Sequence, residues 1–469
     1  MRCQVPVIKA VVFSALGLAC GATACAADDI LRSAETQVAL RYRLTAADEA
    51  LLDEVERACF DYFWKEVGHP ALLARDRKQA PVASIAAVGF QLSGLPIGVE
   101  RKWITRAEGE ERARTVLQAL VQRKDNKKFG VYLHYPDFDT GGPSKRGFEI
   151  LASTVDHALL MAGAITAAQY FGGDVKTLAD RLVADTNWKA FAVNKEGFLS
   201  MGWKPDEPLK LDGPGQFLEL HWWSASDEER LTYFLAVASP NPAYAVDPEL
   251  YYRMKRPIRR HDDMPPFVAS WPGALFTYIF SHCWIDYRSL EADDPNRLGF
   301  EGPRVDWFEN SRRAVLTQRR RCIEESRRFK TLAADRWGLS ACSARDGYIV
   351  PEIRPNICDR DDWCDGTVAP YAATAAIMFT PEESLAAIRA FRGLKDAEGK
   401  PLIWRDPKAG GYGFVDSFNL DQKYACDDYV GIDVGPMLLG IENARTGLIW
   451  KLFMASDTAQ RAIQRLRLQ

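Results

Sequence analysis

Apolar residues recur about every 3.6 residues over long parts of the chain, which is the spacing of one face of an α-helix. In residues 154–171, for example, Val155, Leu159, Ala162 and Ile165 follow this repeat. Runs that alternate between apolar and polar residues, as half-buried strands do, are few and short. The pattern predicts helices over Ala46–Lys65, Thr105–Gln122, Thr154–Phe171, Asp227–Val237, Gly273–Asp286, Asp306–Arg328, Pro381–Phe391 and Val434–Phe453.

Residues typical of helix starts precede several of these segments. Thr105 stands three residues before Glu108, the spacing of a capping box, and Pro381 takes the first helical position after Thr380. No Ser- or Pro-rich linker divides the chain. We therefore expect one closed all-α domain that carries its chemistry on loops at one end. The long loops combine Gly, acidic and aromatic residues and cover 132–142, 197–203, 358–370 and 410–419.

The N-terminus has the order of a secretory signal peptide. Arg2 and Lys9 precede an apolar run, and small residues follow, so that a cut after Ala26 satisfies the small-x-small rule. Cys25 offers the alternative of a lipid-modified cysteine. No later stretch holds the roughly 18 consecutive apolar residues that a membrane helix needs. We therefore expect a signal peptide over 1–26 and a periplasmic or secreted mature chain without a membrane span.

Composition excludes several classes of partner and site. The 469 residues include 60 basic and 63 acidic ones, and this net charge of −3 gives no reason to expect a nucleic-acid partner. Seven of the ten Cys lie beyond the signal region, and Cys358 and Cys364 could close a short disulfide loop. No Cys and His residues stand at zinc spacing, and the acidic run 359–365 lacks the terminal Glu of a calcium loop. We expect neither a metal nor a cofactor.

Common catalytic motifs are also missing, because the chain has no GxSxG, HExxH or GxxxxGKS/T sequence. What remains is a set of acidic residues beside aromatic and Gly residues in the long loops. A protonated and an ionised carboxyl group form the pair that hydrolyses most glycosidic bonds. Aromatic residues make up 11% of the chain and supply flat apolar faces for stacking. These features favour a carbohydrate-active enzyme.

Nine short segments, in order along nearly the whole mature chain, resemble the glycoamylase-like family that contains bacterial endo-β-1,2-glucanases, glycoside hydrolase family 144. They are residues 83–90, 149–156, 199–203, 227–240, 337–342, 365–370, 412–419, 431–436 and 441–448. The resemblance implies an (α/α)6 barrel, or toroid, whose long loops form a carbohydrate-binding cleft. It also implies a catalytic domain over 45–460, preceded by an N-terminal extension over 27–44.

The resemblance assigns catalytic roles to three acidic residues. Glu228 matches the glutamate at the family's Asn-Glu helix start, the favoured general acid, and Asp416 matches the position favoured for the base that activates water. Glu149 is the rival base or an anchor for a sugar hydroxyl. Asp227 replaces the family's Asn, and its charge, if buried, is expected to raise the pKa of Glu228. Glu229 is interpreted as a helix cap.

The resemblance also implies a set of substrate-binding residues. They are Trp203, His134, Tyr412 and Phe414, which match ring-bearing positions of the family's cleft, together with Asp156 and Asp365. Taken singly, each ring is more often a core residue than a sugar platform, and Asp156 stands where it could cap its helix.

We expect an exported glycoside hydrolase that cleaves β-linked glucan, above all β-1,2-glucan, by an inverting mechanism with a carboxylate acid and base. Its expected partner is an oligo- or polysaccharide. Departures from the family pattern at 278–279, Val434 and Ala444 replace hydrogen-bonding or aromatic side chains, and they bear on linkage and on the endo mode. Two alternatives stay open: a transglycosylase or hydrolase of another periplasmic glycan on the same fold, and a non-catalytic glucan-binding protein.

Overall fold

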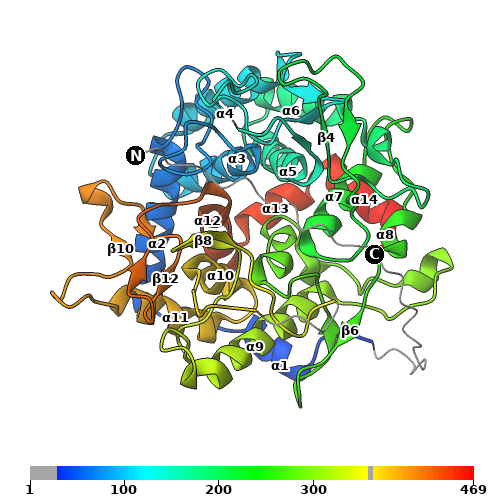
Figure 1. Ribbon diagram of the computed structural model, residues 1–469. Coiled ribbons are helices and arrows are strands. Elements are labelled where there is room, and N and C mark those ends of the chain that lie inside the picture. The colour runs from blue at the N-terminus through cyan, green and yellow to red at the C-terminus, as the bar shows by residue number, and fades with distance from the viewer. Residues whose placement is uncertain (1–28, 147, 358–362) are drawn as a thin grey trace.

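Helices form an inner and an outer ring in the computed structural model, which describes residues 29–146, 148–357 and 363–469. The inner ring consists of α3 (Ile85–Glu100), α5 (Thr154–Phe171), α7 (Asp227–Val237), the 3₁₀ turns η2 (Leu275–Tyr278) and η3 (Ser281–Cys283), α10 (Pro370–Ala375) with η7 (Ala376–Met378), and α12 (Gly431–Arg445). The outer ring consists of α2 (Ala46–Lys65), α4 (Arg106–Val121), α6 (Gly173–Asp185), α9 (Trp307–Glu324) and α11 (Pro381–Gly393). Figure 1 shows the inner helices around the centre and the outer ones at the periphery.

Contacts between neighbours close the inner ring. α12 packs against α3, α3 against α5, and α5 against α7, which in turn contacts η2 and η3. The ring of His282 in η3 lies 4.7 Å from that of Phe379, just after η7, and α10 packs against α12. The apolar helix α3 is buried over nearly its whole length, whereas α9 and α11 bury one face. The predicted all-α (α/α)6 toroid is confirmed.

The remaining elements are short. The remaining helices are α1 (Ala34–Leu40), α8 (Glu249–Arg253), α13 (Leu448–Met454) and α14 (Asp457–Leu466). The remaining 3₁₀ turns are η1 (Trp188–Phe191), η4 (Tyr287–Ser289), η5 (Pro295–Leu298), η6 (Glu325–Arg327) and η8 (Pro407–Ala409). Antiparallel pairs form between β1 (Lys127–Lys128) and β2 (Val131–Tyr132), between β3 (Ala152–Ser153), β4 (Gly202–Lys204) and β5 (Gln216–Phe217), and between β6 (Ile258–Arg259) and β7 (Phe267–Val268). The other pairs are β8 (Cys342–Ala344) with β9 (Gly347–Ile349), β10 (Trp404–Arg405) with β11 (Gly413–Phe414), and β12 (Phe418–Asn419) with β13 (Tyr424–Ala425).

Most predicted helices form where the sequence places them. The helices over 46–65, 154–171 and 227–237 have the predicted bounds. The capping box also forms, because the Glu108 N–H donates to Thr105 Oγ1 at 3.2 Å and the Thr105 N–H donates to the Glu108 carboxylate at 2.7 Å.

Two predicted helices are wrong in extent. Residues 273–286 form the separate turns η2 and η3 instead of one α-helix, and this segment is rich in aromatic residues, which have low helix propensity. The helix predicted over 434–453 is divided into α12 and α13 at Gly447, whose φ of 68° lies in the left-handed region that favours glycine.

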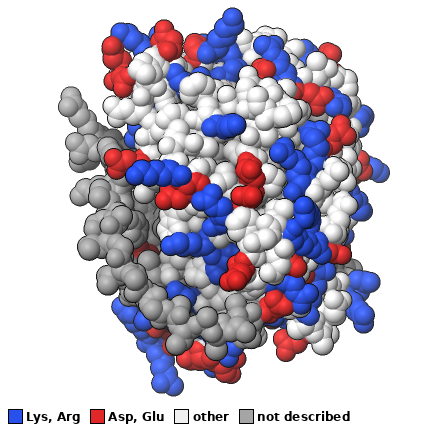
Figure 2. Space-filling model, turned by 90° about the vertical axis from the view of Figure 1, so that its right-hand side faces the viewer, with Lys and Arg blue, Asp and Glu red and all other residues white. Residues whose placement is uncertain are grey.

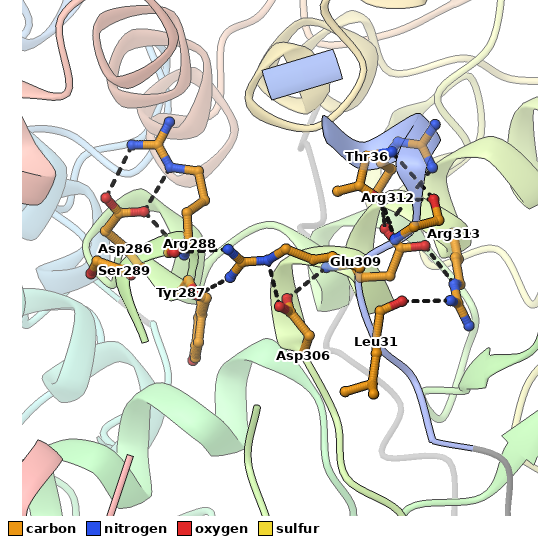
Figure 3. Close-up of polar contacts among 12 residues, drawn as sticks. Leu31, Thr36, Asp286, Tyr287, Arg288, Ser289, Asp306, Glu309, Arg312 and Arg313 are labelled. Atoms are coloured by element: carbon orange, nitrogen blue, oxygen red, sulfur yellow. Dashed lines mark hydrogen bonds and ion pairs between the residues drawn. The ribbon is translucent and has the colours of Figure 1, made fainter. Parts of the chain in front are cut away.

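The N-terminal segment is attached to the outside of the barrel. Arg32 pairs with Asp306, and Thr36 of α1 donates a hydrogen bond to Glu309 of α9 (Figure 3). At the other end of the chain, the domain boundary predicted at residue 460 falls within α14, which packs against α7. The signal peptide predicted over 1–26 and the alternative lipid site at Cys25 lie outside the described residues.

In the described part of the chain, five cysteines carry free, buried thiols: Cys59, Cys283, Cys322, Cys342 and Cys426. Burial raises the pKa of the Cys59 and Cys283 thiols, so they stay neutral packing groups. The disulfide predicted between Cys358 and Cys364 includes a residue outside the described part of the chain.

Charges of both signs are interspersed on the face shown in Figure 2. This distribution fits the small net charge of the sequence. Among the described helices, none is both long enough and apolar enough to span a bilayer.

Two glycines allow α3 and α5 to approach closely. A Cβ atom at Gly163 would lie 2.0 Å from the carbonyl oxygen of Gly89, and one at Gly89 would lie 2.2 Å from that of Leu159. Side chains larger than hydrogen therefore do not fit unless the two helices separate.

We expect Gly163→Ala to lower the free energy of unfolding by about 1–3 kcal/mol, because the added methyl group forces α3 away from α5. Gly393→Ala in α11 is the matched control. Its Cβ meets nothing within 4 Å, so the change should be neutral or slightly stabilising. Urea denaturation at one pH measures both variants, and equal stability of the two would contradict the close approach.

Candidate active site

The first turns of the inner helices meet at one end of the toroid. The N–H of Ile85 in α3 donates to the carbonyl oxygen of His134, and the N–H of His134 donates to that of Leu151, just before α5. The N–H of Gly431, the first residue of α12, donates to the carbonyl oxygen of Asp76 in the loop before α3. Because helix N-termini carry partial positive charge, this end of the barrel favours acidic side chains.

Glu228 is the second residue of α7, at a helix N-terminus. Burial raises the pKa of its carboxyl group well above the ordinary value, and the charges of Glu229 and Asp156 act in the same direction. A hydrogen bond from Trp271 acts in the opposite direction. Part of the residue still reaches solvent, so a substrate can approach it. Glu228 is thus protonated at a pH where an exposed Glu is ionised, which is the state of a general acid.

The expected effect of Asp227 on Glu228 is wrong. Asp227 is fully buried, but it pairs with Arg230 of the same helix and accepts the N–H of Ser281 at 3.1 Å. Because Arg230 compensates its charge, Asp227 is not among the groups that raise the pKa of Glu228.

Glu229 turns back toward the start of α7. Its carboxyl group accepts hydrogen bonds from the hydroxyls of Ser224 and Ser226, and burial raises its pKa to about 7. This orientation agrees with its interpretation as a residue of the helix start, and it leaves Glu228 as the acidic side chain of this turn that reaches solvent.

Asp156 and His134 lie on the same side of the site as Glu228. Asp156, in the first turn of α5, is nearly buried, and its Oδ1 lies 3.4 Å from Nε2 of His134. The ring of His134 stacks on Tyr135 at a centroid distance of 3.7 Å. The side chain of Ser153, which precedes α5, makes no cap hydrogen bond. The structure therefore places Asp156 and His134 together beside the proposed acid.

Asp416 lies in the loop between β11 and β12, and its side chain is hydrogen-bonded to the backbone of β8. Its Oδ2 accepts the N–H of Ser343 at 2.6 Å, whereas its Oδ1 has no hydrogen-bond partner. Burial raises the pKa of Asp416, and Asp433 and the guanidinium of Arg77 oppose this shift. Tyr348 of β9, opposite Ser343 in the strand pair, is exposed beside it.

A small apolar cluster connects the two carboxyl groups. Its buried members are Ala274, Phe276, Phe280 and Ala341, and the partly exposed Trp271, Val350 and Ile432 pack against them. Trp271 hydrogen-bonds Glu228, and Ile432 precedes Asp433, which is within hydrogen-bonding reach of Asp416. The cluster thus reaches from Trp271, the hydrogen-bond partner of Glu228, to Ile432, the chain neighbour of Asp433.

Glu149 belongs to the His134 side of this region. It pairs with Lys204, its side chain is 45% exposed, and its charge acts on Tyr135. Phe148, whose ring lies 5.6 Å from that of Tyr135, lines a hollow of about 470 Å³ together with Glu149. The structure therefore brings Glu149 near the sugar-binding candidates, and it stays a predicted base or hydroxyl anchor.

Three of the predicted cleft rings are core residues instead. Trp203 is 0% exposed and its Nε1 donates to the carbonyl oxygen of Pro214, while Phe414 is 2% exposed and packs on Trp404. Tyr412 is also buried, with its hydroxyl bonded to Glu66 at 2.8 Å. The prediction that these rings contact sugar is wrong, because neighbouring side chains already cover their faces.

Asp365 is engaged within its own loop. Its Oδ1 accepts the N–H of Thr367 at 2.9 Å, and its Oδ2 accepts the side-chain amide of Gln422 at 3.1 Å. These contacts connect the loop before α10 to the loop after β12. A contact between Asp365 and substrate stays a prediction.

Several residues of the site were not expected from the sequence. Asp433 stands in the segment 431–436 as an acidic residue in a first helical turn, the same signal that marks Glu228. Trp271, Arg77, Tyr135 and Tyr348 carry no local signal, because only the fold brings them to the two acidic groups.

Among the described residues, one group has metal-ligand spacing: His261, Asp262 and Glu324. Glu324 already pairs with His261 and with Arg320, so the group is explained by ion pairing alone.

The protonated state of Glu228 makes the stability of the protein depend on pH. The unfolded chain ionises this carboxyl above about pH 4.3, whereas the folded protein keeps it neutral. Its contribution to stability is therefore fully present below that pH and is lost as the pH rises toward the folded-state pKa. Gln has no proton to lose, so we expect Glu228→Gln to gain melting temperature over the wild type between about pH 4 and pH 8. Thermal unfolding at both pH values measures this gain, and a pH-independent difference would contradict it.

Comparisons with known proteins agree with this fold. A family model described as "Glycoamylase: Putative glucoamylase" matches residues 220–457, a segment that contains Glu228, Asp416 and Asp433. A curated relative from Parabacteroides distasonis, named exo β-1,2-glucooligosaccharide sophorohydrolase (non-reducing end), is 29% identical over 467 residues. The match covers 92% of this chain, and the chain spans 60% of the length of that relative.

Two solved structures have the same fold. A β-1,2-glucanase from Parabacteroides distasonis superposes with a TM-score of 0.75 at 26% identity, covering 91% of this chain and 60% of the other. An endo-β-1,2-glucanase from Chitinophaga pinensis, in complex with sophorotriose and glucose, superposes with a TM-score of 0.74 at 24% identity, covering 90% of this chain and 98% of the other.

Proposed function

Because the chain belongs to the glycoamylase family of putative glucoamylases, we propose that it is a glycoside hydrolase that cleaves β-1,2-linked glucan. The single observation that supports this proposal is an apolar cluster with Glu228, whose pKa is raised, at its Trp271 and the neighbouring Asp433 and Asp416 next to its Ile432. A carboxyl acid and a carboxylate base on two sides of a cleft are the requirement for glycoside hydrolysis.

In the proposed reaction, Glu228 donates its proton to the oxygen of the leaving sugar. Asp416 accepts a proton from the attacking water, which adds to the anomeric carbon as the glycosidic bond breaks. The Ser343 N–H and Arg77 stabilise the ionised form of Asp416, whereas burial raises the pKa of Glu228 and favours its neutral form. The two environments thus favour a proton on Glu228 and an ionised carboxylate at Asp416, as the roles of acid and base require. Direct inversion needs carboxyl groups about 6.5–9.5 Å apart, unless a substrate hydroxyl relays the proton.

The substrate proposal rests on the relatives. The curated relative is named for β-1,2-glucooligosaccharides, and the Parabacteroides structure is named a β-1,2-glucanase. This chain spans 60% of the length of both. We therefore do not carry over their exo or endo mode or their preference for substrate length.

We propose that the remaining polar and aromatic groups of the cleft bind the sugar units. Asp156, His134 and Glu149 offer hydrogen bonds to hydroxyl groups on the side of Glu228. Trp271 and Tyr348 offer partly exposed or exposed rings near the two acidic groups. Export through a signal peptide over residues 1–26 is part of the same proposal, because the N-terminus has the charged, apolar and small-residue order of such a peptide.

Product analysis on linear β-1,2-glucan tests the function. We expect short β-1,2-linked products on this substrate, and none on β-1,3- or mixed-linkage glucan under the same conditions. Products longer than the substrate would favour a transglycosylase. Saturable binding without products over long incubation would favour a glucan-binding protein and overturn the enzyme proposal.

A further inference from the structure

Asp416 has a second carboxyl group beside it. Asp433, in the first turn of α12, is within hydrogen-bonding reach of Asp416, and both residues are at most 5% exposed. Oδ1 of Asp416 and Oδ2 of Asp433 are buried, and neither has a hydrogen-bond partner among the described residues. Two neighbouring buried carboxylates repel each other strongly, and two unpaired buried oxygens cost further free energy. One proton between them removes both costs.

We propose that Asp433 keeps a proton and donates it as a hydrogen bond to Asp416, so that Asp433 orients Asp416 and holds it ionised toward the attacking water. Asp433 is thus a positioning residue, because it acts on the reaction through Asp416. This inference rests on the proposed function, since it assigns a partner to the base of that reaction.

The other side of Asp433 suits a neutral carboxyl group. The hydroxyl of Tyr371 in α10 is within reach of Asp433, but it donates its proton to the carbonyl oxygen of Ala341 at 3.1 Å and lies 2.7 Å from Oγ of Ser340. A protonated Asp433 can donate to Asp416 with its hydroxyl and needs no donor from Tyr371, whereas an ionised Asp433 would need one. Asp416 then accepts two hydrogen bonds, one from Asp433 and one from the Ser343 N–H on Oδ2.

The charges around the pair also fit one proton. Arg77 lowers the pKa of both carboxyl groups, and it already pairs with Asp76, while Asp428 adds a further negative charge. If Asp416 and Asp433 were both ionised, their two charges would have to share a guanidinium that already pairs with Asp76.

The other titratable neighbours that are fully or partly buried stay neutral, because burial raises the pKa of each. They are Cys342 of β8, Tyr371 of α10, Tyr424 of β13, and Cys426. The ring of Tyr348 is exposed, but desolvation at its hydroxyl and the charges of Asp433 and Asp416 raise its pKa as well. Burial and the charge of Asp416 likewise raise the pKa of Asp433 well above the ordinary value, which agrees with a retained proton.

Two variants at one position test the hydrogen bond. Asp433→Asn keeps a donor for Asp416, whereas Asp433→Leu has a similar shape and no donor. Without the donor the pKa of Asp416 rises, so we expect the acid limb of the kcat/KM profile to move up by about one pH unit in Asp433→Leu. We also expect kcat at the optimum to fall about 10²-fold as Asp416 loses its orientation. Asp433→Asn should keep the acid limb of the wild type and most of its rate.

An infrared difference spectrum supplies a readout without activity, and it needs only the variant that keeps the donor. At neutral pH the wild type minus Asp433→Asn should show the C=O stretch of one protonated carboxyl group. If the spectrum shows a carboxylate stretch instead, Asp433 is ionised and the proposal is wrong.

The outcomes separate this inference from the proposed function. An inactive wild type on every glucan removes the function, while the infrared band still decides the state of Asp433. An active wild type whose acid limb stays unmoved in Asp433→Leu, or moves equally in both variants, overturns the positioning role.

Discussion

Glu228→Gln is expected to slow the hydrolysis of β-1,2-glucan by about 10²–10⁴-fold, the usual contribution of a general acid. Gln preserves the size of the side chain and its contact with Trp271, but it cannot protonate the departing sugar oxygen. The loss should appear in kcat rather than in KM, because substrate binding does not need the proton. Initial rates of reducing-end release over a range of glucan concentrations measure the two constants separately.

A substrate with a good leaving group distinguishes the acid from a merely structural residue. An aryl β-sophoroside releases a phenolate that needs no proton, so its hydrolysis by the variant should approach the wild-type rate. Glu219→Gln, the same change at an exposed position of the preceding loop, is the matched control and should leave both rates unchanged. Undiminished glucan hydrolysis by Glu228→Gln would remove Glu228 from the mechanism.

The architecture was predictable where local pattern and tertiary packing agree. Amphipathic or capped segments such as 46–65 and 106–121 have the same apolar faces in isolation as in the barrel. The inner helix α3 gave no such pattern, because a helix buried on all sides has no polar face to mark its period. Residues 275–283 could not be predicted as separate turns, since their contacts with Leu339 and Ser340 come from a distant part of the chain.

The acidic residues of the site were easier to predict than its rings. Glu228 and Asp416 stand in segments whose resemblance to a family covers several consecutive residues, and a carboxyl group among Gly and aromatic residues is unusual enough to notice. Trp203 and Phe414 stand in equally good matches, but ring accessibility depends on what packs over each face. The local sequence does not contain that information. Tyr348 is the opposite case, because its ring is exposed although no local signal marks it.

The protonation states of the site follow from the same geometry that makes the barrel. Parallel inner helices bring their first turns to one end, where Asp156, Glu228 and Asp433 gather with Asp416. Several carboxyl groups in one partly dehydrated region cannot all be ionised. Asp416 receives the Ser343 N–H and the field of Arg77, whereas Glu228 receives one hydrogen bond from Trp271. In the proposed mechanism, this unequal supply of donors makes Asp416 the base.

Asp416→Asn is therefore expected to lower kcat on β-1,2-glucan by about 10²–10⁴-fold, since an amide cannot accept the proton of the attacking water. The fold should persist, because the side-chain oxygen of Asn can still accept the Ser343 N–H. Azide, which attacks without losing a proton, should restore turnover and yield a glycosyl azide of inverted configuration. Asp427→Asn, an exposed position of the same loop region paired only with Arg405, is the matched control and should keep wild-type kinetics. If azide leaves the Asp416→Asn rate unchanged while Glu149→Gln responds to it, the base is Glu149 and the attacking water lies on the His134 side.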